Sequence, residues 1–446
     1  MVPRRPAAGE RGGDRILHGV ATSAFQIEGS LEADGRGPSI WDDFPSDAGE
    51  TGAVACDHYR RWREDVDLIA SLGVDAYRFS IAWPRILPEG SGRVEQRGVD
   101  HYSRLIDALL ERGIEPVVTL FHWDLPASLD WRERKTAERF AEFATVCYKH
   151  FGDRVKWWLT INEPWIVGLL GFLLGLHAPG VKDDVRAEAT VFHHLLYAHG
   201  LATQAYDHRH NVGIALNLFP HYPASDDPAD AAAAHGSDGY CNRWFLDPLY
   251  GRGYPSDQRA RYEALIGELD FVRDGDTDVI AAPTEYLGVN YYAPRVIEAA
   301  PGDHPWPWRV VVPEEWPTTA GFTGGVASTG AGTPIAPHGL TDLLTRLHRD
   351  YAPRGIMVTE NGAVFPEPQH DERRVAFLRD HLGAVDDAVA QGAPILGYCH
   401  WSLLDNFEWK LGYAQRFGLV HVDYETQERT IKDSGHAYRE MIRARS

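Results

Sequence analysis

The sequence has few cysteines and no long hydrophobic run. The longest apolar stretch, from Ile166 to Leu176, contains three glycines and is far shorter than the roughly 20 residues that span a bilayer. We therefore expect no membrane partner. The four cysteines show no CxxC spacing, which argues against a zinc cluster or a disulfide framework and favours a reducing, cytoplasmic location: Cys56, Cys147, Cys241 and Cys399.

Basic residues are scarce relative to acidic ones. The chain of 446 residues contains 44 Lys and Arg against 64 Asp and Glu, which gives a formal net charge of −20. Nucleic acids and anionic lipid surfaces bind through clustered Lys and Arg. An acidic chain of this kind is expected to bind neither.

Eight short stretches rich in branched and aromatic residues recur along the chain, and each predicts a buried strand. The segments between them carry apolar residues at every third or fourth position, which is typical of amphipathic helices. The eight predicted strands are Leu17 to Gln26, Asp75 to Trp83, Glu115 to Trp123, Val155 to Asn162, Val212 to Phe219, Tyr286 to Tyr292, Ile356 to Glu360 and Ile395 to Ser402.

Eight alternations of strand and helix, without a break in composition, predict an α/β fold. We expect a single-domain (β/α)8 TIM barrel with extended βα loops over residues 15–446. A doubly wound open sheet is the alternative, but the GxGxxG turn that such a sheet often carries is absent after the first predicted strand.

Two segments are predicted to lack regular structure. Residues 1–14 contain arginine, proline and glycine but no apolar centre or cleavage site of a secretory signal, and we interpret them as a flexible leader. Residues Pro294 to Pro337 are rich in Pro, Gly, Thr and Trp. A loop of that length after the sixth strand is expected to overhang the mouth of a barrel.

Polar residues gather where the predicted strands end. In such a barrel the carboxyl ends of all strands meet at the face that carries the active site. Glu163 follows the fourth strand and Glu360 ends the seventh. Glycoside cleavage needs two such carboxyl groups, one to protonate the leaving oxygen and one to meet the developing oxocarbenium ion. A lone strand-end glutamate is more often part of a salt bridge, whereas two of them flanked by aromatic and amide side chains favour catalysis.

Short motifs surround both glutamates, and further motifs lie along residues 16 to 440. Together they resemble family 1 of the glycoside hydrolases, the β-glucosidase group. The motifs are Gln26-Ile27-Glu28-Gly29, Tyr77-Arg78-Phe79-Ser80, Phe121-His122-Trp123-Asp124, Thr160-Ile161-Asn162-Glu163-Pro164, Asn290-Tyr291-Tyr292, Val358-Thr359-Glu360-Asn361-Gly362, and the run from Trp401 to Trp409.

The resemblance implies a retaining β-glucosidase that hydrolyses terminal, unphosphorylated β-D-glucosyl residues. It implies Glu163 as acid/base and Glu360 as nucleophile, with carboxyl groups about 5 to 5.5 Å apart. Arg78 and Tyr292 would keep Glu360 ionised, and Asn290 completes the implied catalytic group. The implied sugar-binding residues offer hydroxyl partners and apolar faces: Gln26, His122, Trp123, Asn162, Trp165, Trp401, Glu408, Trp409 and Phe417.

No cofactor and no metal is expected. His193, His194 and His199 occur together, but HExxH is absent and such histidines are mostly packing residues. The expected partner is a small-molecule β-glycoside, with a role in carbohydrate metabolism and cellulose degradation. A homo-oligomer remains an open alternative to a monomer.

Particular residues favour or disfavour the alternatives to a β-glucosidase. Glycone preference stays open, so a β-galactosidase, a β-fucosidase or a transglycosylase of the same family remains an alternative. Glu408 and Trp409 disfavour the phospho-sugar relatives, and Glu163 disfavours the thioglucoside-cleaving ones. A non-catalytic sugar-binding barrel is disfavoured because both glutamates are present.

The aglycone side departs from the family pattern. Thr333 precedes the segment Pro337 to Leu340, where the family usually places a tryptophan platform, and Phe322 is the nearest aromatic candidate. The apolar stretch Leu169 to Leu176 predicts a hydrophobic aglycone.

Overall fold

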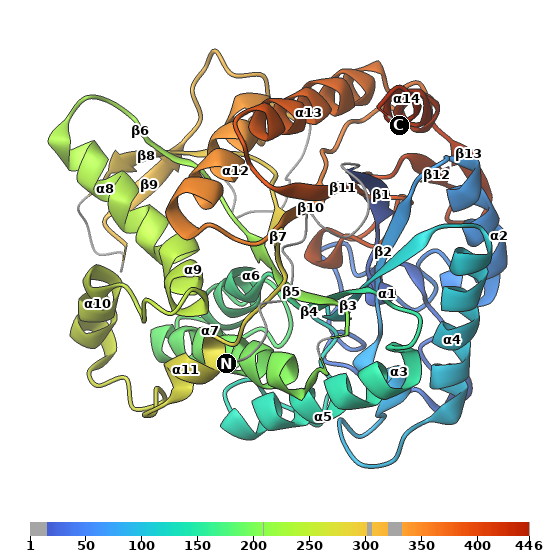
Figure 1. The fold of residues 1–446 in the computed structure, drawn as a ribbon, viewed down its shortest axis with the longest axis horizontal. Coiled ribbons are helices and arrows are strands. Elements are labelled where there is room, and N and C mark those ends of the chain that lie inside the picture. Colours follow the sequence, from blue (N-terminus) through green and yellow to red (C-terminus); the bar gives the residue numbers. More distant parts are fainter. Residues whose placement is uncertain (1–15, 208, 301–305, 320–331, 446) are drawn as a thin grey trace, which may run out of the picture.

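The computed structural model describes residues 16–207, 209–300, 306–319 and 332–445. Eight parallel strands close into a barrel in the order β1-β11-β10-β7-β5-β4-β3-β2, and helices surround them (Figure 1). The predicted TIM barrel is confirmed. The strands are β1 (Leu17–Ala21), β2 (Ala76–Ser80), β3 (Glu115–Phe121), β4 (Trp157–Asn162), β5 (Asn211–Asn217), β7 (Tyr286–Asn290), β10 (Ile356–Asn361) and β11 (Ile395–Trp401).

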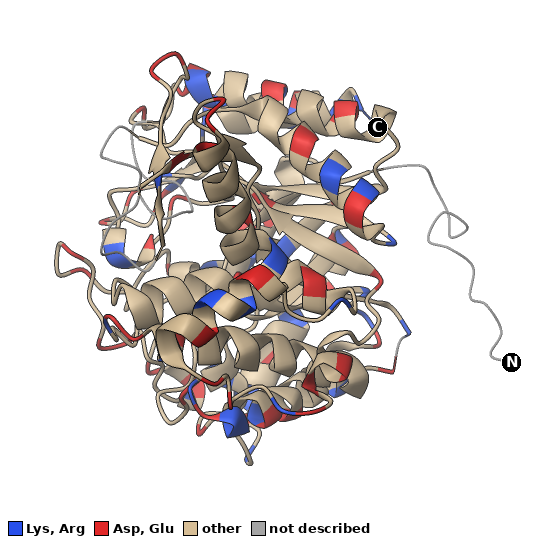
Figure 2. Ribbon diagram, turned by 90° about the vertical axis from the view of Figure 1, so that its left-hand side faces the viewer, with Lys and Arg blue, Asp and Glu red and all other residues tan. Residues whose placement is uncertain are grey.

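The outer helices are amphipathic. In Figure 2 the barrel strands are almost free of charged residues, which lie on the helices and loops. The longer helices are α2 (His58–Ser71), α4 (Gln96–Glu111), α5 (Arg134–Phe151), α7 (Val185–Ala205), α8 (Pro228–Asp238), α10 (Ser256–Ile266), α12 (Pro337–Tyr351), α13 (Glu372–Ala390) and α14 (Asp433–Arg443). Shorter ones are α1 (Ala24–Ile27), α3 (Trp83–Ile86), α6 (Pro164–Gly168), α9 (Trp244–Leu249) and α11 (Asp276–Ile280).

The first three barrel strands end earlier than the sequence predicts. After β1 the hydroxyl of Ser80 accepts the backbone N–H of Ala24 at 2.7 Å, and the hydroxyl of Ser23 donates to Gln26 at 2.6 Å. These side-chain bonds turn the chain into α1, so Gln26 lies on a short helix rather than on a strand. Trp123, beyond β3, has a φ of +79°, which a strand does not allow.

The segment from Pro294 to Pro337 is not wholly irregular, so that prediction was wrong for part of it. β8 (Arg295–Ala299) and β9 (Trp308–Val311) pair antiparallel, and β6 (His221–Pro223) completes a three-stranded sheet. The buried side chain of Ile297 packs on Ala233 and Ala234 of α8, which explains why these residues form strands. Phe322 and the predicted leader, residues 1–14, lie outside the described residues.

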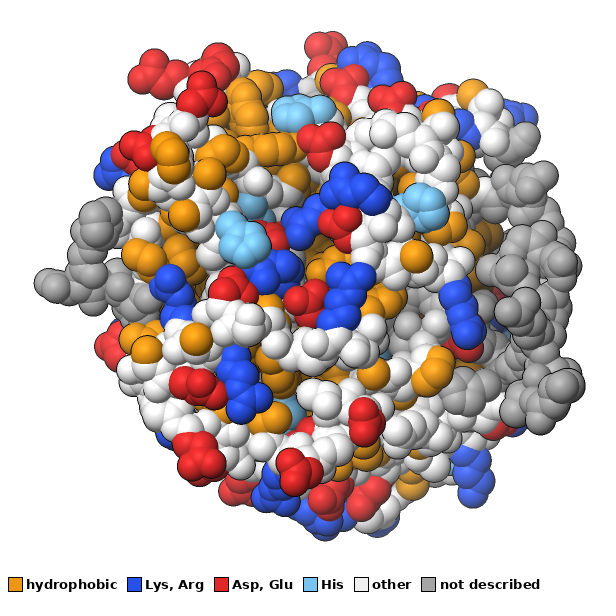
Figure 3. Space-filling view, turned by 60° about the vertical axis from the view of Figure 1, so that its left-hand side comes forward, with side chains coloured by type: hydrophobic (Ala, Val, Ile, Leu, Met, Phe, Trp, Pro, Cys, Tyr) orange, Lys and Arg blue, Asp and Glu red, His pale blue; other side chains and the backbone are white. Residues whose placement is uncertain are grey.

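The surface carries both signs of charge. Figure 3 shows acidic and basic side chains next to one another on one face. All four cysteines are buried and none is joined in a disulfide. Among the described helices, none has the length and apolar character needed to cross a membrane.

A buried ion pair joins the last helices to the active-site loops. Asp371 and Arg374 are fully buried and 2.8 Å apart. Asp371 also accepts the backbone N–H of Ser434 at 2.9 Å, at the start of α14. Arg374 donates to the backbone carbonyls of Arg416 and Phe417 at 2.9 and 3.1 Å. The pair therefore holds the loop after β11 in place.

We expect Asp371→Ala to lower the free energy of unfolding by about 3 to 5 kcal/mol, because it leaves the Arg374 charge buried without its partner. Chemical unfolding followed by tryptophan fluorescence measures the change. The control is Asp386→Ala, which breaks a pair with Arg445 in which the Asp386 side chain is 52% exposed, and should cost at most about 1 kcal/mol. Equal losses in the two variants would contradict the prediction.

Candidate active site

The two glutamates occupy neighbouring positions at the mouth of the barrel. Glu163 directly follows β4 and Glu360 lies in β10, and their exposed fractions are 2% and 3%. Glu163 has a φ of +51°, in the left-handed region, and its backbone N–H donates to the carbonyl of Ala215 at 2.9 Å. Non-glycine residues in this region are uncommon and cluster at functional sites. The turn converts the end of β4 into α6.

Two donors hold the carboxylate of Glu360. Arg78, which is fully buried on β2, donates to one oxygen at 2.6 Å, and the hydroxyl of Tyr292 donates to the other at 2.7 Å. A second nitrogen of Arg78 donates to the side-chain oxygen of Asn162 at 2.7 Å. Glu360 is therefore paired with a permanent charge inside the protein.

A chain of amide side chains reaches from there to Glu163. Asn290 donates to Asn162 at 3.0 Å and to a carboxyl oxygen of Glu163 at 2.7 Å, while Thr359 donates to the oxygen of Asn290 at 2.6 Å. Asn217 donates to the same oxygen of Glu163 at 3.2 Å. One continuous hydrogen-bond network therefore joins the two glutamates.

The environment of Glu163 favours its neutral form. Burial raises the pKa of Glu163 well above its ordinary value, and the negative charge of Glu360 raises it further. The hydrogen bonds from Asn290 and Asn217 and the charge of Arg78 act in the opposite direction. Because burial and a like charge dominate, this carboxyl group keeps its proton where an exposed glutamate would lose it.

His122 is held in one tautomer beside this network. The amide nitrogen of Asn162 donates to Nε2 of His122 at 3.2 Å. Burial and the charge of Arg78 keep the pKa of His122 well below its usual range. The ring is therefore neutral and carries its proton on Nδ1. It lies nearly parallel to the ring of Trp401, with centroids 5.6 Å apart.

The loop after β11 brings a third glutamate to the same place. Gln26 donates to Glu408 at 3.2 Å and to Asn406 at 3.0 Å. Burial and the charge of Glu360 raise the pKa of Glu408 to about 8. Trp409, the next residue, has a φ of +51°. Amide, carboxyl and indole groups therefore surround the space beside Glu360, as the binding of a sugar requires.

Of three aromatic residues predicted to bind the sugar, two contact the hydrogen-bond network and one does not. Trp123 donates from its indole N–H to the carbonyl of Asn162 at 3.0 Å, and Phe417 packs edge-on against Tyr292 at 6.2 Å. Both lie against the network. The ring of Trp165, by contrast, packs against Phe219, Tyr240 and Arg295, none of which belongs to the hydrogen-bond network of the two glutamates.

Sequence reasoning missed several members of the network. Asn217 is the last residue of β5, the one predicted barrel strand that was assigned no site residue, so its position at a strand end was a usable signal. Asn406 and Thr359 lie inside the family motifs, but they hydrogen-bond to Gln26 and to Asn290 rather than to a glutamate. No sequence pattern indicates such contacts.

Within the described part of the chain, no group of three His, Cys, Asp or Glu side chains is arranged to hold a metal ion. The histidines of α7 have protein partners. His193 contacts Asp276 at 2.9 Å, and His199 contacts Thr160 at 2.7 Å.

A buried carboxyl group with a raised pKa, linked by hydrogen bonds to a charge-paired one at the mouth of a (β/α)8 barrel, is the arrangement expected of a glycoside-cleaving enzyme. Comparison with known proteins specifies the family. The family model described as Glycosyl hydrolase family 1 matches residues 13–446. The chain belongs to this family.

Similar proteins agree with this assignment. The chain is 42% identical to Beta-glucosidase A of Acetivibrio thermocellus, over 96% of this chain and 97% of that protein. It is 41% identical to a bifunctional beta-D-glucosidase/beta-D-fucosidase of Bifidobacterium breve, with the same coverage of both chains. A solved family 1 β-glucosidase of Thermotoga maritima superposes with a TM-score of 0.91 at 41% identity, over 97% of this chain and 98% of that one. The family and the enzyme class predicted from the motifs are confirmed.

We expect Tyr292→Phe to lower kcat/KM for a nitrophenyl β-glucoside by about 10- to 150-fold, since a hydrogen bond to a charged group contributes about 1.5 to 3 kcal/mol. Steady-state kinetics measure the loss. Tyr291→Phe is the matched control, because it removes a neighbouring buried hydroxyl that donates to the backbone carbonyl of Ala336 at 2.6 Å. A similar loss of kcat/KM in both variants would refute a specific role of the Tyr292 hydroxyl.

Proposed function

We propose that the chain hydrolyses terminal, unphosphorylated β-D-glucosyl residues by double displacement, with Glu163 as acid/base and Glu360 as nucleophile. The observation that carries the proposal is the contrast between the two carboxyl groups. Glu360 is paired with Arg78 and Tyr292, whereas burial and the charge of Glu360 raise the pKa of Glu163. Relatives named β-glucosidases support glucose as the glycone.

In the first step Glu360 attacks the anomeric carbon while Glu163 gives its proton to the glycosidic oxygen. The bond to the leaving group breaks, the aglycone departs as an alcohol, and an ester forms between the sugar and Glu360. The ester carries no charge. The charge that helped to raise the pKa of Glu163 is thereby removed, so Glu163 becomes a better base for the next step.

In the second step Glu163 takes a proton from water, and the water oxygen attacks the same carbon from the opposite face. The ester bond breaks, Glu360 leaves as a carboxylate, and Glu163 is protonated again. Two inversions give net retention. This mechanism predicts carboxyl groups about 5 to 5.5 Å apart.

The sugar is proposed to lie among Gln26, His122, Asn162, Glu408 and Trp409. These side chains supply donors and acceptors for hydroxyl groups, and the ring of Trp401 supplies an apolar face. A 6-phosphate would meet the carboxyl group of Glu408 where it needs a cation, which favours an unphosphorylated sugar. Solved relatives from Thermotoga maritima in complex with castanospermine and with deoxynojirimycin support a site of single-sugar size.

We also propose a cytoplasmic enzyme that acts on small β-glycosides, including those from cellulose, with residues 15–446 as the catalytic domain and residues 1–14 as a leader. The four unpaired cysteines support a reducing compartment. The apolar residues of the segment from Leu169 to Leu173 support an apolar aglycone.

Azide should distinguish the two glutamates. In Glu360→Ala, azide takes the place of the carboxylate and displaces the leaving group of a dinitrophenyl β-glucoside once, which gives the α-glucosyl azide. In Glu163→Ala, the covalent intermediate still forms with this activated substrate, and azide attacks it from the β face to give the β-glucosyl azide. Proton NMR identifies each anomer.

Glu188→Gln serves as the control, because Glu188 is buried among Tyr240 and Tyr262. We expect no glycosyl azide from it. Identical anomers from the Glu163 and Glu360 variants, or no azide product from either, would reject the assigned roles.

The pH profile tests the environment of Glu163. The enzyme is active while Glu163 is protonated, so the alkaline limb of kcat/KM follows its pKa. Asn217 lowers that pKa by donating to the carboxylate. Asn217→Ala should therefore move the alkaline limb upward by roughly 0.4 to 1 pH unit, from a bond contribution of about 0.5 to 1.5 kcal/mol.

Asn211→Ala, at the opposite end of β5, is the matched control and should leave the limb in place. A downward shift in the Asn217 variant, or an equal shift in both variants, would contradict the expected direction.

A further inference from the structure

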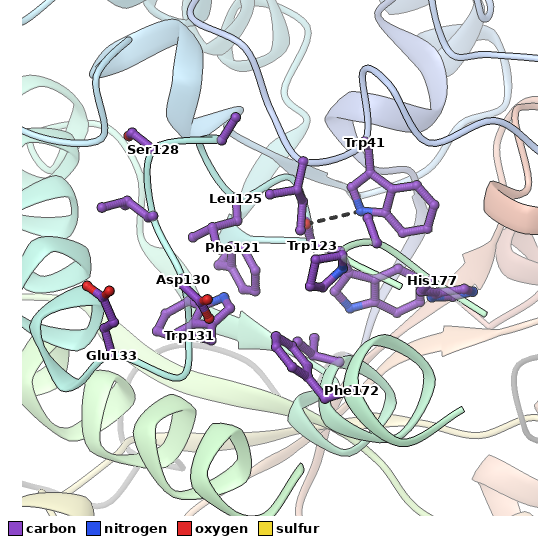
Figure 4. Close-up of a pocket in the computed structure, with 16 residues that line it drawn as sticks. Trp41, Phe121, Trp123, Leu125, Ser128, Asp130, Trp131, Glu133, Phe172 and His177 are labelled. Carbon is purple, nitrogen blue, oxygen red and sulfur yellow. Dashed lines mark hydrogen bonds between the residues drawn. The ribbon is translucent and has the colours of Figure 1, made fainter. Parts of the chain in front are cut away.

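A cavity lined by aromatic rings lies next to the glutamate network, with which it shares Trp123. Its volume is about 290 Å³, and it opens between the loops that follow β3 and β4 (Figure 4). We call it the Trp131 pocket, after one of six rings that line it: Trp41, Phe121, Trp123, Trp131, Phe172 and His177. Neither Glu163 nor Glu360 lines it. The pocket is therefore distinct from the space in which the sugar is cleaved.

The walls of the Trp131 pocket are a connected set of aromatic rings. Phe121 and Trp131 pack edge-on at 5.1 Å, and His177 contacts both Trp41 and Trp123, at 5.2 and 5.3 Å. In Figure 4 these rings and the ring of Phe172 border one open space. Such rings offer the flat apolar faces on which the CH groups of a sugar pack.

The rim of the pocket is polar. Ser128, Asp130 and Glu133 line its edge, and carboxylates accept hydrogen bonds from hydroxyl groups. Burial lowers the pKa of His177 to about 3, so this ring is neutral. Asp130 is paired with Arg132 at 2.6 Å, so the rim carries both signs of charge. An uncharged ring with several hydroxyl groups would find hydrogen-bond partners at the rim and apolar faces below.

One buried donor in the wall has no protein partner. Trp131 is 1% exposed, and among the described residues its indole N–H has no hydrogen-bond acceptor. Buried indole N–H groups usually find a partner.

Trp123 is the wall that the pocket shares with the active site. Its carbonyl accepts the indole N–H of Trp41 at 3.2 Å, its own indole N–H donates to Asn162 at 3.0 Å, and its ring lies 4.8 Å from that of Trp409. Trp123 therefore lines the Trp131 pocket and also bonds to the backbone of Asn162, a member of the network of Glu163 and Glu360.

We propose that the Trp131 pocket is a second carbohydrate-binding site that takes one uncharged sugar ring. A volume of about 290 Å³ lies at the lower end of the range for ligand pockets, which suits a single ring. The proposal goes beyond the hydrolytic function and does not depend on it, since binding here needs neither glutamate.

The test uses the full chain saturated with deoxynojirimycin, which occupies the active site, and titrates methyl β-D-glucoside by calorimetry. We expect one further sugar per chain, with a Kd on the order of 1 mM. Ala127→Trp places a large ring in the pocket from its exposed rim and should abolish this binding. Ala127→Ser, which changes the volume little, should retain it.

A lack of saturable binding to the native chain would overturn the proposal, as would unchanged binding in Ala127→Trp. Tighter binding of phenol than of the glucoside would also overturn it, because the site would then be apolar rather than saccharide-specific. If Ala127→Trp does not fold, Glu133→Ala decides instead. We expect about tenfold weaker binding from the lost hydrogen bond to a carboxylate, and unchanged affinity would reject the proposal.

This binding measurement separates the two proposals. A chain that binds the second sugar but fails to cleave a glucoside would refute only the hydrolytic function. A chain that cleaves the glucoside but binds no second sugar would refute only the Trp131 pocket.

Discussion

The active site depends on one buried cation. Arg78 is fully enclosed, and its guanidinium contacts four barrel residues, with donors to Thr119, Asn162, Thr359 and Glu360. A buried charge without a partner is strongly destabilising, and the planar guanidinium needs acceptors in fixed directions. Glu360 supplies the carboxylate that pairs with this buried guanidinium, at the position where the proposed mechanism needs a nucleophile.

The rest of the site follows from that charge. Burial raises the pKa of the two other carboxyl groups of the site, Glu163 and Glu408, and the negative charge of Glu360 raises it further. Amide side chains then connect the groups without adding charge, since Asn162 accepts from Arg78 and Asn290 and donates to His122. One fixed charge thus orders a network in which the neighbouring groups remain neutral.

Much of this was predictable from sequence. Buried strands and strand-end polar residues follow from composition and spacing, so the barrel and the pair Glu163 and Glu360 could be located. The ends of strands could not, because the hydroxyls of Ser23 and Ser80 redirect the chain through contacts between different segments. The strand-end position of Asn217 marked it as a candidate, but its bond to Glu163 could not be predicted, because it depends on where β5 ends relative to β4. Long-range contacts carry information that a local pattern lacks.

The left-handed backbone at Trp123, Glu163 and Trp409 has a consequence for stability. Such a conformation costs about 1 to 3 kcal/mol at each non-glycine residue, and glycine would relieve it at the expense of the side chain. At these three positions backbone strain and the composition of the site therefore make opposite demands: glycine would relax the backbone, but it would remove a carboxyl group or an indole ring from the barrel mouth. The surrounding fold has to offset this strain.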